Sequence, residues 1–351
     1  MRKLTRIIIG GASAIAATIG LAGCTGAGGG FDASDGLQIV TTTTQLTDFA
    51  ENITEGTEAE ITGLLKPNGS AHHFEANAAD LETIRNADVV IFNGMGLEEP
   101  WLDEVLDSSG FDGVRIDAST NIDPAEIIEG GDDHEHGEEG HGHEGETAEE
   151  ESAEAHDHGE ANPHIWTSPL VAATMVETVV DELAAADSER AGTYEENGAA
   201  YTGKLDELHE WIAANIDTIP EDERLLVTNH NALTYYEVEY GITFVGSVMP
   251  SWDDNAEPSA AEINLLVKNI EESGVQAVFT ETQLNPATAE SIANEAGVKV
   301  YSGEDALYTD ALGEEGSTGA TYIQATIHNT TQLLDSWGGS ATEVPADLQG
   351  A

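Results

Sequence analysis

Basic residues are scarce in this sequence of 351 residues, which holds 11 lysines and arginines against 67 aspartates and glutamates. A nucleic-acid-binding surface needs positive charge to meet phosphate, so the composition argues against nucleic acid as a partner. It argues equally against attachment to an anionic membrane through charge alone. Because the acidic residues are spread along the whole chain, we interpret them as an adaptation to high salt. Attraction of cations is a second effect of the same charge.

Cysteine is almost absent. Cys24 is the only one in the chain, which excludes a disulfide framework and a cysteine metal site. It ends the stretch "MRKLTRIIIGGASAIAATIGLAGC", where a basic start precedes a run of small apolar residues. This is the pattern of a secretory signal peptide over 1–24, and the run is too short for a membrane span. Its end resembles a bacterial lipobox, so we expect Cys24 to be lipidated and the protein to be anchored outside the cell membrane.

The mature part of the sequence alternates short apolar runs with amphipathic stretches, after a flexible tether over 25–36. Strands are expected in the first part at 37–43, 59–65, 87–94 and 113–119, and helices at 46–54, 78–87 and 100–110. The strand pattern returns at 224–230, 242–248, 277–281 and 298–303, before a terminal helix over 321–337. Strands that alternate with helices indicate parallel sheets.

Two consecutive helices, 169–186 and 187–216, separate these parts of the chain. The second has apolar residues at alternating spacings of three and four, which indicates one continuous buried face. We therefore predict an α/β protein with two lobes, 37–186 and 222–345, joined by a long rigid helix over 187–216. Each lobe is expected to contain small parallel sheets flanked by helices. Ion sites favour such a junction and the carboxyl ends of parallel strands, so we expect the site in the cleft between the lobes.

An acidic tract over about 129–161 alternates histidine with acid and glycine, and its composition predicts disorder. Neutral imidazole is a common zinc ligand, so the tract is expected to bind metal as an auxiliary site. Mobile pairs of this kind would bind weakly, exchange fast and raise the local zinc concentration near the main site. The histidines concerned are His134, His136, His141, His143, His156 and His158.

Few histidines lie outside that tract. His72, His164 and His230 each follow an expected strand or stand in a loop with turn residues, which makes them candidate metal ligands. Their spacing alone is weak evidence, because a satisfied core or surface histidine is the commoner case. His209 and His328 lie on expected helices, and we interpret both as ordinary surface histidines.

Four motifs together resemble those of the cluster A-I substrate-binding proteins of metal ABC transporters, the ZnuA-like zinc-uptake group. "GSAHHFEA" resembles the family motif Asp-Pro-His-x-Tyr-Glu-Pro, although Ser70-Ala71 and Ala76 depart from it. "NPHIWTSP" is similar to Asp-Pro-His-x-Trp-x-x-Pro, and "TNHNALTYYEVEYG" to the region of the third ligand. "GEDALYTDAL" resembles the segment that carries the fourth ligand. The likeness covers nearly the whole mature chain, and a histidine-rich acidic loop is typical of the zinc members.

The resemblance implies a ligand set of His72, His164, His230 and Asp310. His73 competes with His72, because a shift of one position would exchange them. Glu304 and Asp305 in "GEDAL" compete with Asp310, although "YTDAL" fits the family segment better. Glu281, at the end of an expected strand, is either a partner of a ligand or a solvated acid.

These implied ligands suit Zn²⁺, with Mn²⁺ as the less favoured ion. The resemblance implies a monomeric extracytoplasmic protein, not an enzyme, that delivers metal to a membrane permease and its ATPase. Two alternatives remain. A zinc enzyme would hold the metal by three histidines and keep a position open for water. A surface lipoprotein that buffers metal would bind it in the acidic tract alone, and the resemblance also allows a role in cell adhesion.

Overall fold

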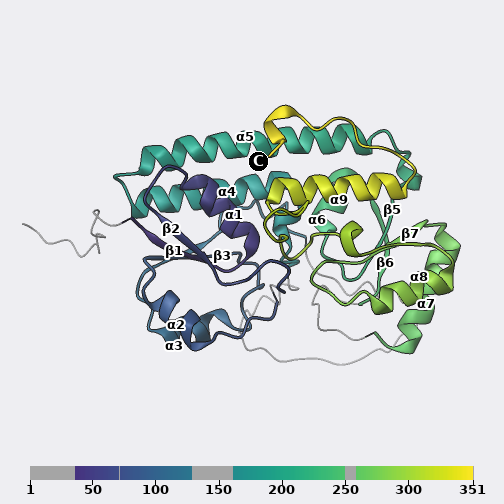
Figure 1. The fold of residues 1–351 in the computed structure, drawn as a ribbon, viewed down its shortest axis with the longest axis horizontal. Helices are drawn as coiled ribbons and strands as arrows, with labels where there is room; N and C mark the ends of the chain where they lie inside the picture. Colours follow the sequence, from purple (N-terminus) through teal and green to yellow (C-terminus); the bar gives the residue numbers. More distant parts are fainter. Residues whose placement is uncertain (1–35, 71, 129–160, 250–257, 351) are drawn as a thin grey trace, which may run out of the picture. The chain divides into compact units, whose positions relative to one another are not determined.

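The computed structural model describes residues 36–70, 72–128, 161–249 and 258–350 and confirms the α/β architecture (Figure 1). The strands are β1 (Gln38–Thr41), β2 (Glu60–Gly63), β3 (Val89–Phe92), β4 (Val114–Asp117), β5 (Leu225–Thr228), β6 (Thr243–Ser247), β7 (Ala277–Phe279) and β8 (Lys299–Tyr301). The α-helices are α1 (Thr44–Ile53), α2 (Ala78–Arg85), α3 (Leu102–Ser109), α4 (Pro169–Ala186), α5 (Ala191–Ile216), α6 (Thr234–Tyr240), α7 (Ala260–Ser273), α8 (Ala287–Ala296) and α9 (Tyr322–Ser336). Short 3₁₀ helices are η1 (Ile165–Thr167), η2 (Glu221–Glu223), η3 (Gly303–Asp305) and η4 (Ala346–Leu348).

The first half of the chain, up to α4, contains a parallel sheet in the strand order β2-β1-β3-β4. Successive side chains of a strand point to opposite faces. Ile39 and Ile91 accordingly join the apolar cluster of α1, α4 and α5, whereas Val40 and Val90 join that of α2 and α3. Figure 1 shows α1 and α4 on one side of this sheet and α2 and α3 on the other. Burial on both faces explains the continuous apolar runs in the sequence.

The second half contains two smaller parallel pairs, β5-β6 and β7-β8. A single bridge between Glu281 and Leu307 extends the pairing beyond β7. Val227 and Val278 pack with α7 and α8 in a cluster of their own. Leu226 and Phe279 face the opposite way, into the cluster that also contains α9.

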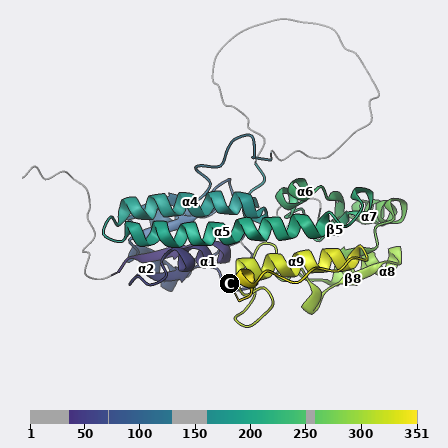
Figure 2. The ribbon, with the colours of Figure 1, turned by 90° about the horizontal axis from the view of Figure 1, so that it is seen from above.

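Helix α5 contacts α1 and α4 of the first half and α9 of the second (Figure 2). Its apolar face is buried, with Tyr194, Leu205 and Leu208 inaccessible to solvent. The largest apolar cluster therefore continues from the first half into the second through α5 and α9.

The helix expected from residue 187 begins at Ala191. Asp187 accepts hydrogen bonds from Arg190 Nη1 (2.8 Å) and from the hydroxyl of Tyr194 (3.0 Å). Its own N–H donates to the oxygen of Leu183, so residues 187–190 form the turn that ends α4.

Within the described ranges, no helix is long and apolar enough to cross a membrane. The expected signal peptide with Cys24 and nearly all of the tether lie outside the described residues. The same holds for the six histidines of the acidic tract, from His134 to His158.

Candidate metal centre

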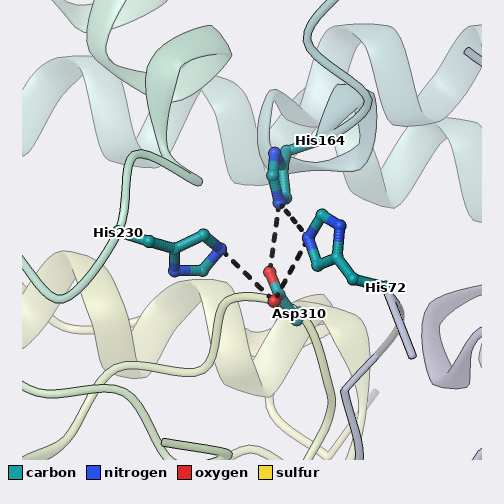
Figure 3. Close-up of side chains that lie close together, drawn as sticks. All are labelled: His72, His164, His230 and Asp310. Atoms are coloured by element: carbon teal, nitrogen blue, oxygen red, sulfur yellow. Dashed lines mark hydrogen bonds and ion pairs between the residues drawn. The ribbon is translucent and has the colours of Figure 1, made fainter. Parts of the chain in front are cut away.

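The structure brings His72, His164, His230 and Asp310 together (Figure 3). Each offers one nitrogen or oxygen atom, and these atoms all lie within 4.8 Å of one another. His72 is 7% exposed and the other three side chains are 0% exposed. They come from separate loops, which follow β2, precede η1, follow β5 and connect β8 to α9. Loops from both halves of the chain thus converge on one buried group.

His72 lies in the loop after β2, where its N–H donates to Ser70 Oγ (3.2 Å). Its Nε2 lies 3.1 Å from His164 Nε2 and 3.7 Å from Asp310 Oδ2. The neighbouring His73 is exposed and does not belong to the group. Of the two registers that the sequence left open, the structure therefore places His72 inside.

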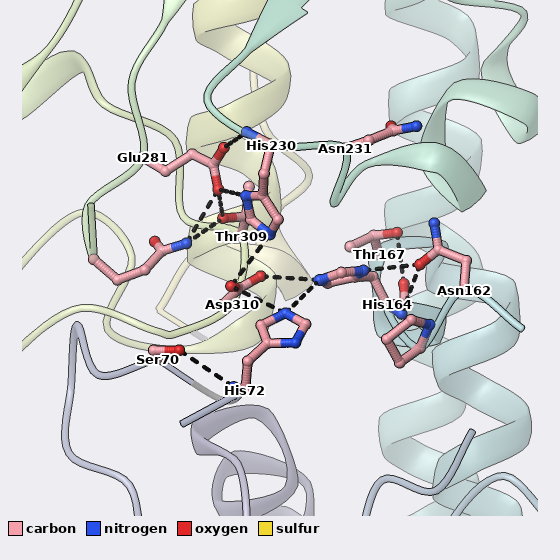
Figure 4. Close-up of polar contacts among 12 residues, drawn as sticks. Ser70, His72, Asn162, His164, Thr167, His230, Asn231, Glu281, Thr309 and Asp310 are labelled. Carbon is pink, nitrogen blue, oxygen red and sulfur yellow. Dashed lines mark hydrogen bonds and ion pairs between the residues drawn. The ribbon is translucent and has the colours of Figure 1, made fainter. Parts of the chain in front are cut away.

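Asn162 orients His164 (Figure 4). The amide oxygen of Asn162 accepts the backbone N–H of His164 (3.0 Å) and lies 2.8 Å from its Nδ1. An amide oxygen can only accept, so Nδ1 carries the proton and Nε2 presents a lone pair to the group. The nitrogen of the same amide donates to Thr234 Oγ1 (3.0 Å), which leaves the oxygen on the side of His164.

Glu281 orients His230 and is fully enclosed, at 2% exposed. One of its oxygens accepts the backbone N–H of His230 (2.9 Å), and the other lies 2.7 Å from His230 Nδ1. This second oxygen also accepts the hydroxyl of Thr309 (2.5 Å), the residue before Asp310. The solvated position considered for Glu281 is therefore wrong, because its carboxylate supports two members of the group.

Asp310 faces the three imidazoles with both oxygens. Oδ1 lies 3.3 Å from His164 Nε2, and Oδ2 lies 3.3 Å from His230 Nε2. Glu304 and Asp305, its competitors in the sequence, are exposed in or beside η3 and lie outside the group.

Burial and the charges of neighbouring groups have opposite effects on the pKa values of these side chains. Burial lowers the pKa of His164. Burial alone would also lower the pKa of His230, but the carboxylates of Asp310 and Glu281 raise it well above its ordinary value. Burial would raise the pKa of Asp310, and the imidazoles of His230 and His164 hold it well below its ordinary value. Asp310 is thus an anion that attracts positive charge into the group.

The spacing of the group fits a metal ion. In a tetrahedron with bonds of about 2.0–2.2 Å, neighbouring donor atoms are about 3.3–3.6 Å apart. Four contacts between donor atoms of the group run from 3.1 Å to 3.7 Å, and all of its donor atoms lie within 4.8 Å of one another. Neither oxygen of Asp310 has a partner in hydrogen-bond geometry within the described part of the chain, although both are buried. Since buried oxygens ordinarily find donors, their aim at a common point indicates a cation.

The remaining predicted histidines lie elsewhere. His209 is partly exposed on α5, 3.1 Å from the hydroxyl of Tyr240. The interpretation of His328 as a surface residue is wrong, because it is 8% exposed and contacts Thr318 Oγ1 and the oxygen of Ala306. Sequence reasoning did not single out Asn162 or Thr309, whose only signal is that each lies within two residues of a candidate ligand.

Two α/β halves with a buried His₃Asp group at their junction define a class, the metal-binding substrate-binding proteins that serve ABC transporters. The family described as zinc-uptake complex component A, periplasmic, matches residues 39–336. The chain belongs to this family, as its motifs predicted. Members of the family are substrate-binding proteins of transporters.

Individual relatives are named for different metals. The manganese-binding lipoprotein MntA of Halalkalibacterium halodurans is 32% identical over 86% of this chain and 88% of its own length. The zinc-binding lipoprotein AdcA of Streptococcus pneumoniae is 29% identical over 85% of this chain and 55% of its own. The solved periplasmic zinc binding protein TroA of Treponema pallidum shares the fold, with a TM-score of 0.71 and 23% identity over 86% of this chain and 99% of that one. The comparisons and the His₃Asp group together support binding of a divalent metal.

Proposed function

We propose that this protein captures zinc outside the cytoplasm and delivers it to the permease of an ABC transporter, with His72, His164, His230 and Asp310 as the ligands. One observation carries the proposal: buried donor atoms from four loops converge within 4.8 Å of one another. The orphaned oxygens of Asp310 support it, since a bound cation would satisfy both.

The two halves act in this proposal as lobes, 37–186 and 222–345, with α5 as the connecting element. His72 and His164 come from the first lobe, and His230 and Asp310 from the second. Metal binding draws the lobes together, and separation of the lobes breaks the ligand set. The shape of the protein therefore reports its occupancy, which lets the permease recognise the loaded form. Lipidation of Cys24 would hold the monomer at the membrane next to the permease and its ATPase.

Zinc is the first candidate because three imidazoles and one carboxylate form a closed, four-coordinate nitrogen and oxygen set. Manganese favours more oxygen ligands in an octahedral arrangement. It is the second candidate because the MntA relative is named for manganese. A competition titration of the metal-free protein with both ions decides between them, and tighter binding of manganese would reverse the order.

The decisive experiment is calorimetry and native mass spectrometry of the mature protein without residues 131–160. We expect one tightly bound zinc ion per chain in this deletion variant and in its His209→Ala derivative. His230→Ala in the same background should lose that ion. If the deletion alone abolishes tight binding, the acidic tract is the site and the proposal fails.

The spectrum of the cobalt-substituted protein separates a transport site from a catalytic one. A closed set of His₃Asp ligands gives a four-coordinate spectrum that does not change with pH. An enzyme with three histidines and a metal-bound water would give a spectrum that titrates as the water loses its proton.

A further inference from the structure

Asp310 lies in a segment, 308–312, that is hydrogen-bonded to both halves of the chain. On the side of the second half, Tyr308 N–H donates to Asn329 Oδ1 (2.9 Å), and the hydroxyl of Thr309 donates to Glu281 (2.5 Å). These bonds tie the segment to α9 and to the end of β7. By sequence position alone, Asp310 would move with the second half.

The first half holds the same segment by a different set of groups. The main-chain oxygen of Thr309 accepts two hydrogen bonds, from Gln45 Nε2 (3.1 Å) and from Trp166 Nε1 (2.9 Å). Both donors are 2% exposed.

The first half also holds the end of the segment. Leu312 N–H donates to Thr44 Oγ1 (2.8 Å), and Asn68 N–H donates to the oxygen of Leu312 (3.0 Å).

The carbonyl of Thr309 belongs to the peptide group that leads into Asp310. A carbonyl oxygen has two lone pairs, and here each receives one donor. Because the peptide group is planar, fixing its oxygen also fixes the direction in which the chain enters the Cα of Asp310. The position of the Cα that carries the carboxylate is thereby held from α1 and from η1, and η1 begins next to His164.

We propose that Gln45 and Trp166 are positioning residues that hold Asp310 in the ligand set across the junction of the two halves. The inference rests on the proposed function. The two donors attach the carboxylate to the half that supplies His72 and His164. Their bonds to Thr309 O therefore slow release of the metal, because separation of the halves has to break them as well. Loss of an outer partner of a metal ligand weakens binding about 10–100-fold in general.

The test is a double-mutant cycle between Gln45→Met and Asp310→Ala, measured as the zinc dissociation constant and dissociation rate. Methionine is close to glutamine in size but has no donor. We expect Gln45→Met to weaken binding about tenfold, mainly through faster dissociation, and to have no further effect in the Asp310→Ala background. Trp166→Phe removes the second donor and should weaken zinc binding in the same way, again with no further effect in the Asp310→Ala background. It replaces Gln45→Met in the cycle if that variant does not fold.

Asn215→Leu is the matched control. Asn215 is 1% exposed and donates to the oxygen of Trp211 within α5, away from the metal group, so its loss should lower stability and leave zinc affinity unchanged. Wild-type affinity in both donor variants would overturn the inference, and so would a loss of the same size with and without the Asp310 carboxylate. If the unsubstituted protein itself binds no zinc, the proposed function has failed first. The two failures are thus distinguishable.

Discussion

The two halves of the chain bring different chemistry to the same group. The first half supplies His72 and His164, and among the described residues the backbone N–H of His72 donates to Ser70 and His164 contacts Asn162, both of which are neutral. The second half supplies His230 together with two buried carboxylates, Asp310 and Glu281. Among the described residues, both carboxylates that contact the group therefore come from the second half. In the proposed site, a divalent cation would balance these two carboxylates, and the imidazoles of the first half would complete the coordination.

The largest effect is expected from removing a charged ligand of the second half. Asp310→Ala should weaken zinc binding by more than about 100-fold, beyond the range typical of outer partners. Asp305→Ala, a carboxylate lost from the exposed surface of the same loop, should bind zinc like the unsubstituted protein. Calorimetry at fixed pH measures both, and equal affinities for the two variants would contradict the assignment of Asp310.

Glu281→Gln tests whether the second carboxylate acts through His230. One oxygen of the carboxylate accepts the backbone N–H of this residue and the other lies 2.7 Å from its Nδ1, whereas an amide has only one oxygen to offer. We expect about 10–100-fold weaker zinc binding, with the crystal structure of the variant showing a rotated His230 ring. An unchanged affinity would mean that the charge of Glu281 is irrelevant to the metal.

A third buried carboxylate of the second half, that of Glu237, lies outside the metal group, and its burial lowers the stability of the protein when it ionises. Burial raises the pKa of Glu237 from 4.5 to about 8, and its Oε1 has no hydrogen-bond partner among the described residues. The folded chain keeps a proton that the unfolded chain loses between pH 4.5 and 8, so this group lowers stability as the pH rises through that window.

Glu237→Gln should therefore leave the free energy of unfolding unchanged below pH 4.5 and raise it above pH 8. At about 1.4 kcal/mol per pKa unit, and with allowance for rearrangement around a buried charge, we expect a gain of about 2 kcal/mol. Urea unfolding of the metal-free protein at both ends of the window measures it. A gain of equal size at both ends would show that the carboxyl is not the cause.

The smallest effect is expected from giving the first half a charge of its own. Asn162→Asp preserves the acceptor for His164 Nδ1. A carboxylate partner of a metal-bound histidine makes the imidazole more basic, so that it binds the metal more strongly. Zinc affinity should rise by less than about tenfold, and proton competition should become stronger at low pH. Asn162→Ala is the control and should weaken binding. A weaker site in Asn162→Asp would show that the neutral partner is required.

The sequence predicted best those members of the group that stand next to a local structural signal, such as the end of a strand or a proline. His230 was expected at the end of a strand, and β5 ends two residues before it at Thr228. His164 directly follows Pro163 and precedes η1, and the proline had already marked this position in the sequence. By contrast, the residues around Asp310 offered three acids in seven positions, and only the family motif favoured the correct one. The bridge between Glu281 and Leu307, in the loop that leads to Asp310, is a long-range contact that no local pattern encodes.

Groups that act from far along the chain were not predictable. Gln45 and the oxygen of Thr309 that it contacts are 264 positions apart. His328 was misjudged because its helix packs against the Asp310 loop, which hides a side chain that looks solvent-facing in the sequence. Helices α6, α7 and α8 were not singled out either.

The apolar cluster that runs through α5 and α9 has a consequence for how the protein melts. Because it takes side chains from both halves, neither half keeps its packing when the other unfolds. We expect one cooperative calorimetric transition for the metal-free protein in place of two separate ones. A ligand bound at the junction then raises the melting temperature of the whole chain, and a simple thermal shift reports on occupancy without any label.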